Sequence, residues 1–347
     1  MSFVEFLNPV ADIFSSEIRN DDWIFRLHHF VTVSGLLSFC ILMTISQYVG
    51  TPMHCTETGK MDESTFNTYC WIHGVETKGD WVAKSPQHLN CDNNSCWHHN
   101  YYQWVVFVVI IQASCFYLPK FIWDYNEGGR IQSLLDKIDR KTIISLTKED
   151  KLEFSDSISN IIDYMHGNLG KHKGWAFVFY ACEMLNLINV LAQFHFTDLF
   201  LGGRFIELTL NGLSVDDSSG FLPLTGKCNY FKYGSGGERE TYEGICVLPL
   251  NLINQKFYIL FGLWLSFLAL ASAFSVTLRL LLIVSLELRR FFLGYVYGWH
   301  RSGFSKKCKH LENLDHGDWF LITRILQNMS GITRYLFLEQ LEGGCEI

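Results

Sequence analysis

The sequence predicts an all-α membrane protein with four transmembrane helices, a disulfide-linked extracellular domain with some β-structure, and a cytosolic helical domain. Three observations lead to this prediction. Four long stretches are almost free of charge, Lys and Arg are unevenly shared among the segments between them, and six of the 11 cysteines fall in two of those segments.

The overall composition leaves only two broad classes of protein open. Charged residues make up 18% of the 347 residues, against roughly 25% in average soluble domains. A net charge of -7 argues against a nucleic-acid partner, and 28 Phe, 15 Tyr and 10 Trp exclude disorder. Eleven cysteines are too dilute for a small disulfide scaffold. A large globular enzyme or a membrane protein remains.

The four apolar stretches decide between these two classes. Residues 30–49, 101–119 and 257–278 contain no charged side chain, and residues 174–197 contain only Glu183. At a rise of about 1.5 Å per residue, each stretch is long enough to span a hydrocarbon core of roughly 30 Å. Buried core helices rarely run beyond about 14 such residues. In the third span we expect the costly polar side chains to face other helices or a wet cavity. These side chains are Glu183, Asn186 and Asn189.

The connecting segments are 1–29, 50–100, 120–173, 198–256 and 279–347. Four spans place the first, third and fifth of them on one side of the membrane. That group contains 20 Lys and Arg, and the other two segments contain 8. The positive-inside rule therefore predicts that both termini are cytosolic. We expect the first span itself to direct insertion, because no signal-peptide pattern precedes it.

The cysteines support the same orientation. The two predicted outside segments contain Cys55, Cys70, Cys91, Cys96, Cys228 and Cys246. Such a concentration fits disulfides in an oxidising compartment. Six cysteines allow fifteen connectivities, so the residues alone leave the pairing open. A rival interpretation is a zinc site made from His88, Cys91, Cys96, His98 and His99, but these spacings fit no common finger. We expect no metal and no cofactor.

Several separated motifs resemble those of the innexins, the invertebrate gap-junction proteins related to pannexins. The motif Tyr101-Tyr102-Gln103-Trp104-Val105 opens the second span, which ends at Pro119. Further matches are Gly50-Thr51-Pro52-Met53-His54-Cys55, Glu127-Gly128-Gly129, Cys182-Glu183-Met184-Leu185-Asn186, Leu248-Pro249-Leu250-Asn251 and Gly317-Asp318-Trp319-Phe320.

The resemblance implies specific disulfides. Innexins have two cysteines in each outside loop, and these are linked between the loops. Carried over to this chain, the pattern pairs Cys55 with Cys246 and Cys70 with Cys228. Cys91 and Cys96 depart from the family pattern, and we interpret them as an extra local bridge.

The resemblance also implies a function, which is that of a gap-junction channel subunit. Such subunits form rings, typically of eight, in the plasma membrane at cell–cell junctions, and two rings dock to pass ions and small molecules. The expected partners are other copies or other innexins, the opposing hemichannel and membrane lipids, with no nucleic acid. No nucleophile–base or nucleotide-binding motif points to an enzyme.

The N-terminal stretch has the pattern of an amphipathic helix. Its apolar residues recur at helical three- and four-residue steps, and they are Phe3, Phe6, Leu7, Val10, Ile13 and Phe14. Two interpretations remain open, a surface helix on the cytosolic domain and a helix folded into the pore mouth. The second, which the family supports, makes the following residues candidates for lining the pore: Phe3, Glu5, Leu7, Asp12 and Glu17.

Three further features carry structural expectations. The residues Tyr101–Val105 are expected to anchor the outer end of the second span, and Pro119 to kink or end it. In the segment 120–173, Thr147 precedes a predicted second helix start.

Two other functions remain as alternatives. Asn93 lies in a glycosylation sequon, and a glycan there would block docking and leave a pannexin-like hemichannel. A four-span adhesion or scaffold protein is the other alternative, although tetraspanins have a short first loop and claudins a short second loop. Here the loops contain 51 and 59 residues.

Overall fold

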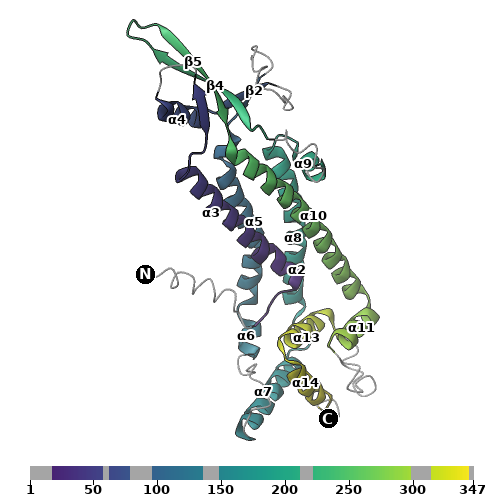
Figure 1. Cartoon of the computed structure of the whole chain (residues 1–347). Coiled ribbons are helices and arrows are strands. Elements are labelled where there is room, and N and C mark those ends of the chain that lie inside the picture. Colours follow the sequence, from purple (N-terminus) through teal and green to yellow (C-terminus); the bar gives the residue numbers. More distant parts are fainter. Residues whose placement is uncertain are drawn as a thin grey trace. The chain divides into compact units, whose positions relative to one another are not determined.

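The computed structural model describes residues 18–57, 62–78, 96–135, 148–211, 222–297 and 314–343. The described chain is mostly helical and contains one five-stranded sheet (Figure 1). It divides into two compact units. The first unit comprises residues 1–27, 118–186 and 271–347, and the second comprises residues 28–117 and 187–270. Each unit is described by itself below.

Within the described ranges, four helical segments are long and apolar enough to cross a membrane. They are Trp23–Tyr48, α5 (Val105–Glu127), α8 (Lys173–Phe200) and α10 (Pro249–Val284). The first consists of α2 (Trp23–Arg26), a π-helical turn η1 (Leu27–Thr32) and α3 (Val33–Tyr48). The helices run past the uncharged stretches because a helix continues into polar sequence until a cap or a breaker stops it. The predicted fold class is confirmed.

Pro119 does not end the second span, because α5 continues through it to Glu127. The proline lacks the N–H that would bond to the preceding turn, which is why the sequence favours a helix end there. The residues that follow it are held by burial instead. Trp123 is fully buried and packs against Trp175 and Phe179 of α8 at ring distances of 5.3 and 4.9 Å. This packing offsets the missing hydrogen bond.

The second unit contains the sheet, whose strand order is β1-β5-β4-β2-β3 with antiparallel pairing throughout. The first predicted outside loop supplies β1 (His54–Glu57), β2 (Val75–Lys78) and β3 (Cys96–His99). The second supplies β4 (Thr225–Tyr233) and β5 (Arg239–Val247). The β4–β5 hairpin thus lies in the middle of the sheet, with strands of the other loop on both sides of it.

Helix α4 (Glu63–His73) packs against β1 and β4. It begins at a capping residue, Asp62, whose carboxylate accepts a hydrogen bond from Thr65 N at 3.1 Å. Phe66 and Cys70 lie on its buried face. Helix α9 (Phe205–Asn211) buries Phe205 and Leu208, and the ring of Phe205 lies 5.3 Å from that of Phe194 on α8 and 6.4 Å from that of Tyr258 on α10. A separate cluster of buried side chains, Phe66 and Cys70 among them, forms the core of the sheet.

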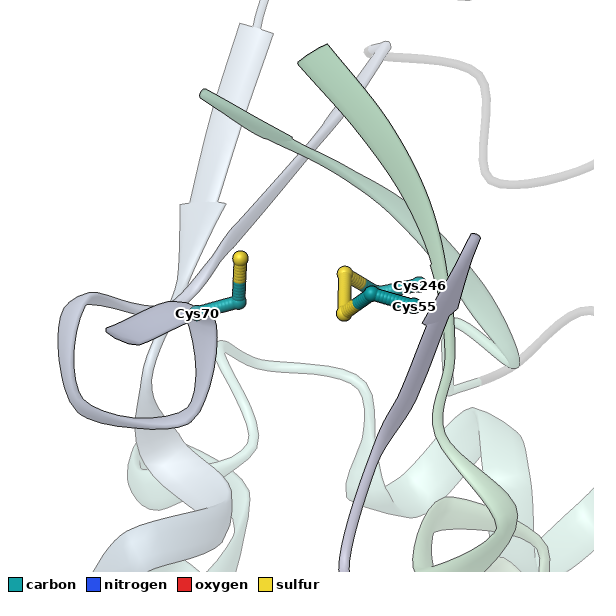
Figure 2. A group of neighbouring side chains, drawn as sticks. All are labelled: Cys55, Cys70 and Cys246. Carbon is teal, nitrogen blue, oxygen red and sulfur yellow. A yellow bond between two sulfur atoms is a disulfide. The ribbon is translucent and has the colours of Figure 1, made fainter. Parts of the chain in front are cut away.

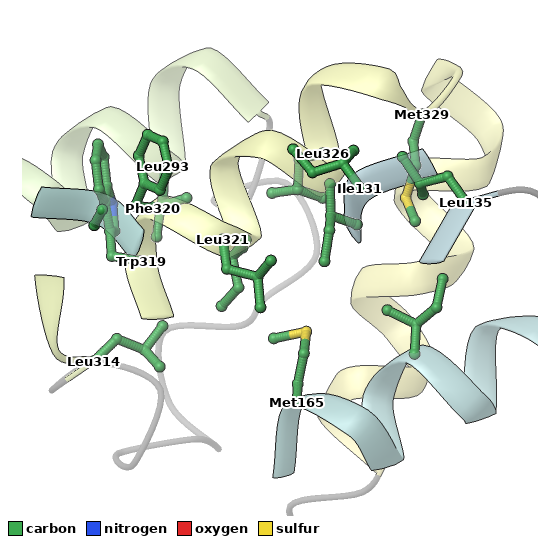
Figure 3. Close-up of a cluster of buried hydrophobic side chains, with 14 of the residues drawn as sticks. Ile131, Leu135, Met165, Leu293, Leu314, Trp319, Phe320, Leu321, Leu326 and Met329 are labelled. Atoms are coloured by element: carbon green, nitrogen blue, oxygen red, sulfur yellow. The ribbon is translucent and has the colours of Figure 1, made fainter. Parts of the chain in front are cut away.

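The first unit contains a cluster of helices with a large apolar core (Figure 3). Its shorter helices are α6 (Arg130–Leu135), α7 (Lys148–Gly167), α11 (Leu286–Tyr297), α13 (His316–Asn328) and α14 (Gly331–Gly343). Figure 3 shows Ile131, Leu135 and Met165 facing side chains of α13. Helix α7 is described from Lys148 onward, and Thr147 lies outside the described residues, so the predicted helix start there stays a prediction. Helices from distant parts of the sequence thereby share one core.

Candidate functional site

Two disulfides connect the two loops that form the sheet. Cys55 on β1 lies directly opposite Cys246 on β5, and their sulfurs are bonded. Cys70 on α4 is bonded to Cys228 on β4. These are the pairs that the innexin resemblance implies. Each bridge joins residues more than 150 positions apart, so together they fasten α4 and β1 to the central hairpin.

The four bonded cysteines form one buried sulfur cluster rather than a metal site. Sulfurs of Cys55, Cys70 and Cys246 lie within 4.8 Å of one another, and Figure 2 shows the bond between two of them. A metal would need thiolates, whereas sulfurs engaged in disulfides have no thiolate to offer. The two disulfides therefore cross-link β1 to β5 and α4 to β4 inside the core of the sheet.

Helix α4 approaches the sheet closely at a glycine. Gly244 lies directly opposite Cys228, and a Cβ on Gly244 would lie 2.6 Å from Cε1 of Phe66 and 2.9 Å from the carbonyl oxygen of Thr56. The side chain of Asn67 reaches back to the strand, where its Oδ1 accepts a hydrogen bond from Cys55 N at 2.9 Å. The absence of a side chain at Gly244 thus lets α4 lie where Cys70 meets its partner.

The motif Tyr101–Val105 joins the loop structure to the start of α5. Tyr101–Gln103 forms a short 3-10 helix, η3. Tyr102 is buried with its ring 4.6 Å from that of Trp71, and Gln103 Nε2 donates to the carbonyl oxygens of Trp71 and Ile72 at the end of α4. In the same motif, the first residue of α5, Val105, is buried and Trp104 is exposed. The motif therefore ties α4 to the second span.

A buried histidine stands at the edge of the same region. His99 ends β3, and its Nε2 lies 2.7 Å from Oγ1 of Thr77 on β2. Burial, followed by the nearby His98, lowers the pKa of His99 to about 4. His99 therefore stays neutral at ordinary pH, in the form that packs and hydrogen bonds within the sheet.

In the first unit, side chains of α13 and of α5 both hold residues 19–22. Asn328 of α13 accepts a hydrogen bond from Arg19 N and donates one to Arg19 O. Gln327 Nε2 donates to Asp21 O at 3.1 Å. From α5, Lys120 forms an ion pair with Asp21 at 3.3 Å and donates to the side chain of Asn20. Trp123 Nε1 donates to the Asn20 backbone at 3.0 Å. We call this four-residue stretch the lead-in segment, because the first span begins directly after it.

A charge network continues from the lead-in segment into the spans. Both carboxylate oxygens of Asp22 accept hydrogen bonds from Arg324 of α13, at 2.7 and 2.9 Å, and Arg279 of α10 also pairs with Asp22. Arg279 Nε in turn donates to Glu183 of α8 at 3.0 Å, and Ser275 donates to the same carboxylate at 3.1 Å. Of the three polar side chains predicted to face other helices or a wet cavity, Glu183 and Asn186 are buried and Asn189 is half-buried.

A third contact fixes the start of α13. His172, just before α8, shares a hydrogen bond with Asp318 at 2.8 Å, and Gly170 N donates to the other carboxylate oxygen at 2.7 Å. A Cβ on Gly317 would lie 2.5 Å from Lys173 N, so only a glycine permits this approach of two backbones. The Gly317-Asp318-Trp319-Phe320 motif thus docks α13 onto the beginning of the third span.

Several predicted site residues lie outside the described residues. These are the pore-lining candidates Phe3, Glu5, Leu7, Asp12 and Glu17, the sequon residue Asn93, and Cys91. Cys96 starts β3, but its side chain is not among those described. The Cys91–Cys96 bridge and the pore helix therefore stay predictions.

Asp22, Arg279, Arg324 and His172 were not among the residues that the sequence patterns predicted. A signal for one of them, Arg279, was present, because Glu183 is the only charge within its span and needs a partner, and Arg279 is the first charge after the fourth span. Asp22 and Arg324 lie in polar segments where a charge is usually solvated. No local pattern distinguishes them.

Comparisons with known proteins agree with this architecture. A family model described as Innexin matches residues 21–343. Innexin shaking-B of Drosophila melanogaster is 32% identical over 335 residues, which cover 91% of this chain and 88% of that protein. Innexin inx2 and Innexin inx3 of the same organism are 31% and 30% identical, over 89% and 93% of this chain and 87% and 84% of those proteins. With the four spans and the disulfide-linked sheet, these matches show that the chain belongs to the innexin family.

Proposed function

We propose that this chain is a gap-junction channel subunit. Copies of it, alone or with other innexins, would form a ring of eight subunits in the plasma membrane, and two such hemichannels would dock between neighbouring cells. The channel would pass ions and small molecules and would perform no enzymatic reaction. The observation that carries the proposal is the sheet in which the hairpin of one loop lies between strands of the other and two disulfides link the loops, in an innexin-family chain with four candidate spans.

A preformed sheet suits docking for an energetic reason. A loop that becomes ordered only on contact loses conformational entropy at the interface, whereas a cross-linked sheet has already lost it. The hairpin also carries exposed apolar side chains, which are Phe231, Tyr233, Ile245 and Val247. The guanidinium of Arg239 lies 3.6 Å from the centre of the Phe231 ring and holds that ring in place. These features favour a rigid surface that contacts another protein.

The proposed orientation places the sheet outside the cell and both termini in the cytosol. The surplus of Lys and Arg in the other segments supports it, and so do the disulfides, which persist in oxidising compartments. The helical core of the first unit would then lie in the cytosol.

Residues 1–17 are proposed to form the pore-mouth helix. The apolar face of this helix would rest on the first span, and the carboxylates of Glu5, Asp12 and Glu17 would face the lumen as rings of charge. The anchored lead-in segment supports this proposal because it fixes the point from which such a helix would start. Reversal potentials in a salt gradient test it for Glu5→Gln and Asp12→Asn. We expect a weaker cation preference, and unchanged selectivity in both variants would contradict it.

Paired-cell recording tests the main proposal. Cells expressing the chain should show junctional conductance in pairs. Large conductance in single cells without coupling in pairs would instead indicate a non-docking pannexin-like channel, and glycosidase treatment would then show whether Asn93 carries a glycan. Adhesion without any conductance would indicate a four-span adhesion protein. Particle images would show the number of subunits and whether there are one or two rings.

A further inference from the structure

The two disulfides of the sheet lie close enough to react with one another. The sulfurs of Cys55, Cys70 and Cys246 lie within 4.8 Å of one another, and Cys228 is not a member of this group. Figure 2 shows the sulfur of Cys70 beside the Cys55–Cys246 bond. Cys70 is therefore next to a bridge to which it does not belong. The proposed channel function makes no use of this proximity.

The surrounding contacts hold Cys70 in this position. Cys70 lies on the buried face of α4, and the side chain of Asn67 on the same helix accepts a hydrogen bond from Cys55 N at 2.9 Å. Cys70 and Cys55 are only 0% and 4% exposed. A reactive group held beside its target reacts as though it were highly concentrated, which offsets the smaller thiolate fraction of a buried thiol.

The chemistry that such a pair of bridges permits is thiol–disulfide exchange. A thiolate attacks one sulfur of a disulfide, bonds to it and expels the other sulfur as a thiolate. Cys70 itself has no thiolate while it is bonded to Cys228. A low-molecular-weight thiol from outside, which reaches this buried bridge when α4 opens locally from the sheet, would attack Cys228, remain on it as a mixed disulfide and release Cys70.

We propose that the two bridges are coupled, so that opening one of them rearranges the other. The released Cys70 thiolate attacks the sulfur of Cys55, a Cys55–Cys70 bond forms, and the Cys55–Cys246 bond breaks. Cys246 leaves as a thiolate and takes up a proton. Cys55 is the target because α4 is hydrogen-bonded to the backbone of that residue. Two sulfur–sulfur bonds exist before and after the exchange, and the external thiol on Cys228 accounts for one of the later two, so no oxidant is needed.

The exchange changes which parts of the chain are cross-linked. Each native bridge joins the first outside loop to the second. The new bridge joins Cys55 to Cys70, which both belong to the first loop and lie 15 positions apart. One reaction with one thiol thus removes both covalent links between the loops, and attack of Cys246 on Cys55 restores them. The sheet is therefore a redox-sensitive device within a single chain, independent of docking between cells.

Two matched variants test the coupling, because they remove the same bridge and differ only in the thiol that remains. Cys228→Ser leaves the thiol of Cys70 beside the other bridge, and Cys70→Ser leaves the thiol of Cys228. The purified full-length proteins are alkylated in acid and digested, and linked peptides are identified by mass spectrometry. We expect a Cys55–Cys70 link in Cys228→Ser and only the Cys55–Cys246 link in Cys70→Ser.

The other outcomes of this comparison contradict the proposal. If both variants contained only the Cys55–Cys246 link, the two bridges would not be coupled. If Cys228→Ser contained a Cys70–Cys246 link instead, the loops would stay joined and the proposed direction would be wrong. Equal rearrangement of both variants would show that the position of Cys70 is unimportant. Both variants also carry serine at positions 91 and 96, so that no other cysteine of the outside loops takes part.

The protein with all its native cysteines keeps the proposal testable if these variants fold poorly. It is exposed briefly to reduced glutathione in detergent and then alkylated and mapped in the same way. We expect both native bridges to be lost together, with glutathione on Cys228 and the alkylating reagent on Cys246. Loss of the Cys70–Cys228 bridge with the Cys55–Cys246 bridge intact would overturn the coupling, and resistance of both bridges would overturn the role of a small thiol.

Discussion

Asp22 and Arg324, 302 residues apart, form a two-pronged ion pair in which each carboxylate oxygen meets one guanidinium nitrogen, at 2.7 and 2.9 Å. The guanidinium carbon of Arg324 is also 4.3 Å from the ring centre of Phe179 and 4.7 Å from that of Phe320. The guanidinium group therefore stacks on two aromatic rings as well as pairing with a carboxylate. One side chain of α13 thus touches the lead-in segment and the third span together. A movement of α13 would therefore change the contacts of Asp22, directly before the first span.

Arg324→Gln should destabilise the first unit by about 1–3 kcal/mol, because it removes a buried charge partner while Asp22 keeps its carboxylate. Asp22→Asn should cost more, since it takes the carboxylate from the guanidinium of Arg324, which is 2% exposed, whereas in Arg324→Gln the carboxylate of Asp22 keeps Arg279. The double variant should be less destabilised than the sum of the two single variants. Thermal unfolding of the purified proteins in the same detergent measures this coupling. Arg130→Gln is the control, since Arg130 is exposed, and strict additivity would contradict the coupling.

Gly244→Ala should loosen the sheet, because the added Cβ would press on Phe66 and on the backbone oxygen of Thr56. Overpacking of this kind costs about 1–3 kcal/mol. We expect a lower unfolding temperature and reduced junctional conductance between cell pairs. Gly236→Ala is the matched control in the neighbouring hairpin turn, where a Cβ would meet nothing within 4 Å. Equal behaviour of the two variants would show that the close approach of α4 is unimportant.

Removing one of the two disulfides should weaken the sheet without abolishing it. The sequence separations of 191 and 158 differ by 33, so with one bridge intact the other closes a loop of only that length. In the chain-entropy model such a closure contributes about 3–4 kcal/mol. Cys70→Ala with Cys228→Ala should therefore lower the unfolding temperature, and removal of all four cysteines should lower it further. Cys115→Ala is the control, because Cys115 forms no disulfide, and coupling between cell pairs should follow the same order.

The sequence predicts the membrane architecture well because hydrophobicity and charge are properties of long segments. A stretch such as 257–278 is apolar over its whole length, so its assignment as a membrane span does not depend on the residues beside it. Pro119 shows the limit of local reasoning, since the propensity of one residue is overruled by the burial of Trp123 four positions later. Tertiary packing decided the end of that helix.

The site was less predictable because its contacts join distant segments. The strands β1, β2 and β3 have four residues each, too few for a clear alternation, and the order β1-β5-β4-β2-β3 depends on pairing between loops. The disulfide pairs were implied by the innexin resemblance, whereas the Asp22–Arg324 pair had no comparable motif. Charge alone cannot identify a partner 302 residues away.

Acidification should loosen the β2–β3 edge of the sheet through His99. Its pKa is about 4 in the folded protein, against about 6.5 in an unfolded chain. Between these values the unfolded state binds more protons, so stability is complete above about pH 6.5 and falls as the pH drops toward 4. Hydrogen exchange of the β2 and β3 peptides should therefore accelerate across this range, and His99→Gln should make that change smaller.

His54→Gln is the matched control for this pH dependence. His54 also has a threonine partner, with its Nε2 2.8 Å from Thr51 Oγ1, but that pair is exposed, whereas the Thr77–His99 pair is buried. His54 lies on β1 and not at the β2–β3 edge, so this variant should keep the wild-type pH profile of the β2 and β3 peptides. If His54→Gln flattened the profile and His99→Gln did not, burial of His99 would not be the cause. A flat wild-type profile between pH 7 and 4 would likewise contradict the lowered pKa, because the folded sheet would then accept the proton as readily as the unfolded chain.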